Sequence, residues 1–190
     1  MQKLLSLFAL VMVVGCNSTP TIYTEANIAD TTEFFSVVNF INSQIDDVQK
    51  TPYFIYKKTA NNGKTDSIAI TTAQFVNLAA PFLQPDINSR ELKKEYIESP
   101  FYDQTTKTYT LNYSTRNKTL EVQNEDVIMN EDGETLKRIF IRKFYSYSND
   151  SSAIVQLTWK PNASFQVSRI VQKKDGSENE TQTTVVWNSK

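Results

Sequence analysis

Polar and apolar residues alternate along much of the second half of the chain. The pattern is clearest over residues 109–113 and 154–159, where every second side chain is apolar or aromatic. A period of two places these side chains on one face of a sheet and their polar neighbours on the other. Short polar segments separate the alternating stretches, so we expect a meander of about six antiparallel strands with one buried face.

Glycines mark three of the expected turns. Gly63 follows an asparagine, and Gly133 and Gly176 each follow an aspartate. Such pairs supply the positive φ angles that tight β-hairpins need. The first pair predicts an N-terminal hairpin between residues 53–58 and 66–70, and the other two predict hairpins within the meander.

Three further segments have the apolar spacing and the capping residues of amphipathic helices. Prolines are expected to end the second and the third of them. The first helix is expected to begin after Asp30 and to reach Lys50. The second is expected between Thr71 and Pro81, and the third between Asn88 and Pro100. The fold class expected is therefore α+β: one domain over residues 30–190, with three helices packed on an antiparallel β-meander of about six strands plus an N-terminal hairpin.

The N-terminus has the pattern of a secretion signal. An apolar run follows Lys3 and is too short to cross a bilayer as a helix. The one cysteine of the chain, Cys16, comes directly after this run. The sequence Val13-Val14-Gly15-Cys16 resembles the lipobox of bacterial lipoproteins. An ordinary signal peptide that contains a cysteine, or an N-terminal core strand, are the alternatives.

The resemblance implies that residues 1–15 are removed as a lipoprotein signal peptide and that the Cys16 thiol carries acyl chains such as palmitate. These chains would anchor the protein in a membrane. Asn17 stands where an aspartate favours retention in the inner membrane, so the resemblance implies the outer membrane, with the domain facing the periplasm. Residues 16–29 are polar and lack periodicity, which predicts a tether. The rest of the chain resembles small lipoproteins of Bacteroidota through Phe34-Phe35-Ser36-Val37 and Leu157-Thr158-Trp159, a resemblance that implies no activity.

Composition excludes several classes of chemistry. The chain has no histidine, which excludes Ser-His-Asp and Cys-His catalysis and zinc sites built from histidine. Its glycines form no phosphate-binding loop. With 20 basic and 21 acidic residues the charge is nearly balanced, which argues against a nucleic-acid partner. We expect no enzyme, no cofactor and no metal.

The remaining candidates for chemistry are carboxylates, lysines and hydroxyls. The acidic pairs are neighbours in sequence, so their side chains point apart and form no ready-made acid and base. These pairs are Asp46-Asp47, Glu125-Asp126 and Glu131-Asp132. Asp46-Asp47 is more typical of a solvated helix face, and Glu131-Asp132 is more typical of a turn. The alternative to a binding module is an envelope hydrolase that depends on carboxylates or on a Ser-Lys pair.

Aromatic residues are the other candidates. Tyr145, Tyr147, Trp159 and Trp187 could line a ligand face, although such residues more often belong to the core. Positive charges on both faces of residues 137–143 predict an edge strand protected against mispairing. The function expected is a non-catalytic binding or scaffolding module whose partner is an envelope lipid, glycan or protein.

Overall fold

The computed structural model describes residues 33–61, 64–147 and 151–188. The compact unit considered below is Glu33–Lys190. The predicted signal peptide, Cys16 and the predicted tether lie outside the described residues, as does Asp30, the predicted cap of the first helix.

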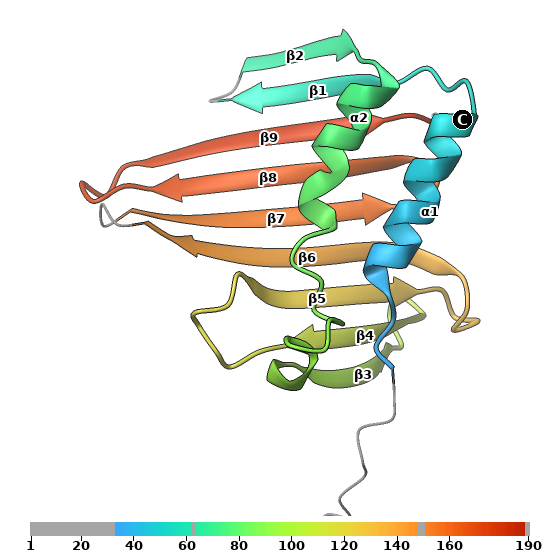
Figure 1. Cartoon of the computed structure of the whole chain (residues 1–190), viewed down its shortest axis with the longest axis vertical. Coiled ribbons are helices and arrows are strands. Elements are labelled where there is room, and N and C mark those ends of the chain that lie inside the picture. The colour runs from blue at the N-terminus through green and yellow to red at the C-terminus, as the bar shows by residue number, and fades with distance from the viewer. Residues whose placement is uncertain (1–32, 62–63, 148–150, 189–190) are drawn as a thin grey trace, which may run out of the picture. The chain divides into compact units, whose positions relative to one another are not determined.

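Nine strands of the described chain form one antiparallel sheet, in the order β2-β1-β9-β8-β7-β6-β5-β4-β3 (Figure 1). Each strand from β3 to β9 lies beside the next one in sequence, as in a meander. The strands are β1 Tyr56–Asn61, β2 Lys64–Ala69, β3 Ile97–Asp103, β4 Thr108–Ser114, β5 Val122–Met129, β6 Leu136–Ser146, β7 Ser152–Lys160, β8 Ser164–Gln172 and β9 Glu178–Val186.

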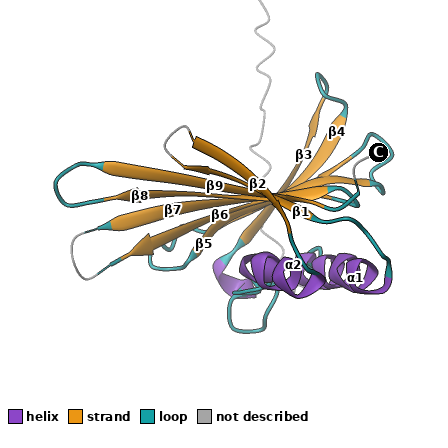
Figure 2. Ribbon diagram, turned by 90° about the horizontal axis from the view of Figure 1, so that it is seen from above, coloured by secondary structure: helices purple, strands orange, loops and turns teal. Residues whose placement is uncertain are grey.

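Two α-helices, α1 Val37–Lys50 and α2 Thr72–Ala79, cover one face of this sheet in the described part of the chain. Figure 2 shows both on the same side, with none on the other. We call the two sides the covered face and the open face. The sheet is thus sealed by a helical layer on one side only.

Helix α1 begins later than predicted. Its cap is Ser36, whose hydroxyl accepts a hydrogen bond from the backbone N–H of Asn39. The preceding Phe34 and Phe35 are not helical: the Phe34 ring lies 4.6 Å from that of Tyr113, and the Phe35 N–H donates to the Tyr113 hydroxyl. These contacts with β4 hold the segment before Ser36 outside the helix.

Helix α2 follows its prediction. The Thr71 hydroxyl accepts from the Gln74 N–H, and the Gln74 side chain accepts from the Thr71 N–H, which completes the capping box. Phe75 and Ala79 are buried against the sheet. A short 3₁₀ turn, Ala80–Phe82, contains Pro81 and ends the helical segment.

The third predicted helix is wrong. Within that segment only Lys93–Glu95 forms a 3₁₀ turn, and Tyr96 is extended so that its hydroxyl donates to the Val122 carbonyl. Pro100 lies inside β3 and does not end a helix. Strand β3 is at the edge of the sheet, where the missing N–H of proline costs no ladder bond.

The strand count also differs from the prediction. The six predicted strands of the meander are present as β4–β9, but β3 precedes them, and the N-terminal hairpin joins the same sheet because β1 pairs with β9. Gly133 and Gly176 have φ angles of +69° and +81°, which confirms the turn assignment of both.

The core lies between the helices and the covered face. Its centre is a cluster of rings in which Trp159 and Phe165 stack at 5.0 Å between centroids. Phe82 and Phe75 meet these rings edge-on from the helical layer, and Trp187 lies 5.4 Å from Trp159. This packing fixes the sheet from one side and leaves the open face free of covering helices.

Candidate functional site

Two of the four predicted ligand-contacting aromatics belong to the core. Trp159 has no exposed surface, and Trp187 is 3% exposed. Both lie beneath Phe75 of α2, so neither contributes to an accessible ligand face. Trp159 and Trp187 do lie on the same side of the sheet, as a shared ligand face would require, but the helices cover that side.

Tyr145 lies at the end of β6 and Tyr147 just after it, and their rings stack with 6.5 Å between centroids. The Tyr145 hydroxyl donates to Glu121 Oε1 at 2.6 Å, and burial with this hydrogen bond raises the pKa of Tyr145. The Tyr147 hydroxyl accepts from the Arg169 guanidinium at 2.6 Å. Both hydroxyls are therefore engaged within the protein.

Lys143 lies on the covered face and is 3% exposed. Its ammonium group pairs with Glu121 Oε1 at 3.0 Å and donates to the Gln84 carbonyl. The prediction of an edge strand here is wrong, because β6 pairs with both β5 and β7. The charges of this strand have another cause: Lys143 is paired inside the protein, whereas Lys137, Arg138 and Arg142 are exposed.

Glu125, on β5, is the buried carboxyl group of this region. Only 4% of it is exposed, and its Oε1 atom has no hydrogen-bond partner. Burial raises its pKa to about 8, with Asp86 and Asp126 adding to the rise and Lys143 opposing it. A hydrolase would need such a group in an open pocket beside a second one, and the burial of Glu125 favours a structural role.

The open face carries a different set of side chains on the same strand. Arg138, Phe140, Arg142 and Phe144 are successive outward residues of β6, while the residues between them point to the core. Four such positions cover about 20 Å of strand. The Arg138 guanidinium lies over the Phe140 ring at 5.6 Å. Cations and rings therefore alternate along the centre of the open face.

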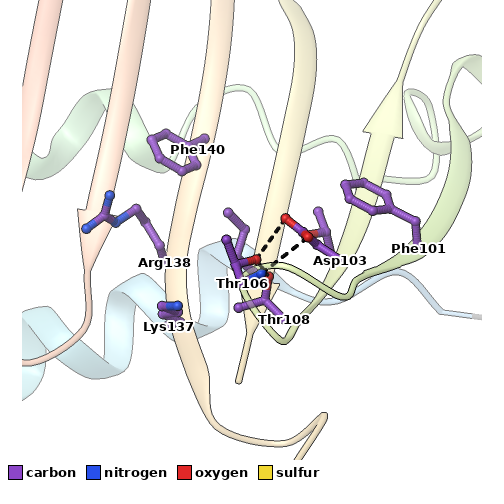
Figure 3. Close-up of a pocket in the computed structure, with 9 residues that line it drawn as sticks. Phe101, Asp103, Thr106, Thr108, Lys137, Arg138 and Phe140 are labelled. Atoms are coloured by element: carbon purple, nitrogen blue, oxygen red, sulfur yellow. Dashed lines mark hydrogen bonds between the residues drawn. The ribbon is translucent and has the colours of Figure 1, made fainter. Parts of the chain in front are cut away.

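Three hollows follow this row, and we call them together the β6 groove. The first, of about 350 Å³, lies between β3 and β6, with Phe101 on one side and Arg138 and Phe140 on the other (Figure 3). The second, of about 260 Å³, includes Phe140 and Arg142, and the third, of about 340 Å³, includes Arg142 and Phe144. Neighbouring hollows share a lining residue, Phe140 or Arg142, so the three follow one another along β6.

Hydroxyls and a carboxylate line the β3 end of the groove. Asp103 accepts hydrogen bonds from the Thr105 and Thr106 N–H groups and from the Thr106 hydroxyl, which lower its pKa. The Thr106 and Thr108 hydroxyls lie 2.8 Å apart. Asp103 is therefore ionised at neutral pH and occupied in holding this turn.

Amides line the middle of the groove. Asp126, the cross-strand neighbour of Phe140, accepts hydrogen bonds from Asn112 at 2.6 Å and from Asn124 at 2.8 Å. Among the ion pairs of the described residues, none involves Arg138 or Arg142. The Asp126 carboxylate is therefore held by amides, and neither guanidinium group is neutralised by a carboxylate of the described residues.

The sequence contained a signal for this row. Arginine and phenylalanine alternate over residues 138–144 with the period of a strand. The charges predicted a protected edge strand and the aromatics predicted a core, because the pattern does not tell which face of a sheet the helices leave uncovered.

Comparison of the chain with models of known protein families, with curated protein sequences and with solved structures found no match in any of the three. Over the described ranges, no three or more acidic or cysteine side chains gather where they could hold a metal ion. None of the helices there has both the length and the apolar character needed to cross a bilayer.

Proposed function

We propose that this protein is a non-catalytic binding module of a bacterial cell envelope, anchored by acyl chains on Cys16, and that its open sheet face binds the ligand. The observation that best supports the binding role is the β6 groove. An open face of an antiparallel sheet normally carries polar side chains toward water. Here Phe101 and Phe144 are 54% and 37% exposed beside arginines that have no carboxylate partner in the described chain.

The anchoring part of the proposal rests on the N-terminal sequence. Cys16 follows a short apolar run and a small residue, and Asn17 favours the outer membrane. Residues 16–29 would separate the domain from the bilayer surface. In this arrangement the acyl chains attach the protein, and the folded unit is left to bind a ligand in the periplasm.

Replacing Cys16 with alanine tests the anchor. We expect the wild-type protein from membrane extracts to lack residues 1–15 and to carry added acyl mass, whereas Cys16→Ala carries none and leaves the outer-membrane fraction. Intact-mass analysis and fractionation of both proteins measure this. A wild-type protein without acyl mass would contradict the anchor but would leave the binding role to be tested separately.

Removing the centre of the groove tests the binding role. We expect Phe140→Ala combined with Arg142→Ala to weaken binding to isolated envelopes of the organism that encodes the protein by at least about tenfold, because one ring and one charged donor are lost. Co-sedimentation of the mature chain carrying Cys16→Ala measures the loss without the anchor.

The matched controls are Phe54→Ala and Arg169→Ala. Phe54 is 74% exposed and precedes β1, which three strands separate from β6, and Arg169 is an exposed arginine on the covered face. Each control removes a phenylalanine ring or a guanidinium group from a site outside the β6 groove. We expect both control variants to bind the envelopes as the wild type does. Equal binding by the groove variant and the controls would overturn the proposed function.

A further inference from the structure

We infer that the ligand of the β6 groove is an anionic glycan, a chain of sugar rings that bears carboxylate groups. This inference rests on the proposed function and specifies its ligand. It follows from three properties of the groove: its rings, its neutral hydrogen-bonding groups and its charge.

The rings are spaced along a track rather than gathered in one pocket. Phe101, Phe140 and Phe144 border successive hollows of the groove. A flat ring packs against the apolar face of a sugar and excludes water from it. An extended polymer can use several such platforms in turn, whereas a single small ligand would fill only one hollow.

Neutral polar groups flank these rings. Asn124 and Gln156 are the cross-strand neighbours of Arg142 on the two sides of β6, and Thr158 is that of Phe140. All three line the middle hollow. Amides and hydroxyls both donate and accept, as the hydroxyls of a sugar require. An acyl chain of a lipid has no groups that could form hydrogen bonds with these side chains.

The charge of the groove is positive. Arg138 and Lys137 line the first hollow, and Arg142 and Lys118 line the third. The two carboxylates of the groove, Asp103 and Asp126, already accept two or more hydrogen bonds each. Guanidinium groups pair with carboxylates through two parallel hydrogen bonds, so an acidic sugar complements this surface better than a neutral one.

Other polymers fit the geometry less well. An extended peptide pairs with the edge of a sheet through its backbone, and the groove lies on the face of a central strand. Nucleic-acid surfaces are strongly basic, whereas this chain has a net charge of −1. A glycan with spaced carboxylates needs only the few cations that the groove offers.

The test is a titration of the mature chain carrying Cys16→Ala with oligogalacturonate and with its methyl ester, which keeps the sugar rings and removes the charge. Polyglutamate serves as an anionic probe without sugar rings, and oligo-deoxythymidine serves as one that carries phosphates and deoxyribose in place of uronic acid rings. We expect oligogalacturonate to bind, the methyl ester to bind at least about tenfold more weakly, and added salt to weaken the former. Arg142→Ala and Phe140→Ala should each weaken binding about tenfold, while Arg169→Ala and Phe54→Ala should not.

Several outcomes would overturn the inference. Equal binding of the methyl ester would show that the arginines do not recognise carboxylates, and equal binding of polyglutamate would show that sugar rings are not recognised. Equal binding of oligo-deoxythymidine would show that the groove does not prefer an acidic glycan to a nucleic acid. No binding of oligogalacturonate, with envelope binding still lost in the groove variant, would overturn the glycan and leave the proposed function standing. Thermal unfolding of each variant confirms that it is folded, as expected for positions outside the buried core.

Discussion

Replacing Trp159 with alanine is expected to lower the free energy of unfolding by about 3–5 kcal/mol, the usual cost of removing a buried tryptophan. Trp159 has no exposed surface and contacts rings from both layers of the fold. Phe82 belongs to the helical segment and Phe165 to β8. The cavity left by the missing indole ring would therefore remove packing contacts between the helical layer and the sheet. Urea unfolding measures the loss, and Trp187 remains as a fluorescent probe in the same cluster.

Two further variants separate packing from other effects. Trp159→Phe keeps most of the ring contacts and removes an indole N–H that has no hydrogen-bond partner, so it should cost clearly less than alanine. Phe54→Ala, at an exposed site, should change stability by no more than about 0.5 kcal/mol. A Trp159→Ala protein as stable as the wild type would contradict the assignment of this cluster as the core.

Turns and helix caps that depend on neighbouring residues could be predicted from the sequence. The turns at Gly133 and Gly176 depend on backbone angles that asparagine, aspartate and glycine favour, and the flanking alternation is visible within each strand. The capping box of α2 is equally local, since all its partners lie within four residues. Such features need no knowledge of the rest of the chain.

The failures concern contacts between distant residues. The segment after Asn88 has a helical start signal, but the Tyr96 hydroxyl finds the Val122 carbonyl, and β3 pairs with β4 in place of a helix. The pairing of β1 with β9 joins two strands that lie far apart in the sequence, and no pattern within either strand encodes it. Tertiary contacts therefore override local propensity in both places.

The candidate site was missed for the same reason. Alternation predicted that Phe140 and Trp159 lie on strands, and it also separates inward from outward positions on one strand. It does not say which face the helices cover. Only the placement of α1 and α2 makes Trp159 a core residue and leaves Arg142 on the open face (Figure 2).

The second large effect concerns pH and Glu125. Its pKa rises from 4.5 to about 8 on folding, chiefly because burial disfavours the charged form. Between these two values the folded protein keeps a proton that the unfolded chain has released. The wild-type free energy of unfolding should therefore fall as the pH rises through this range, by on the order of 5 kcal/mol in total.

Glu125→Gln should remove this decline, because glutamine has the shape of the protonated acid and does not titrate. We expect the two proteins to be equally dependent on pH below about pH 4 and the variant to be the more stable one at about pH 9. Urea unfolding across this range measures the difference. Glu134→Gln, the same substitution at an exposed turn residue, should follow the wild-type curve. If the Glu125→Gln variant also follows the wild-type curve, the expectation is contradicted. Glu125 would then be ionised beside Lys143 in the folded protein, and the core would hold two charged groups rather than a neutral acid.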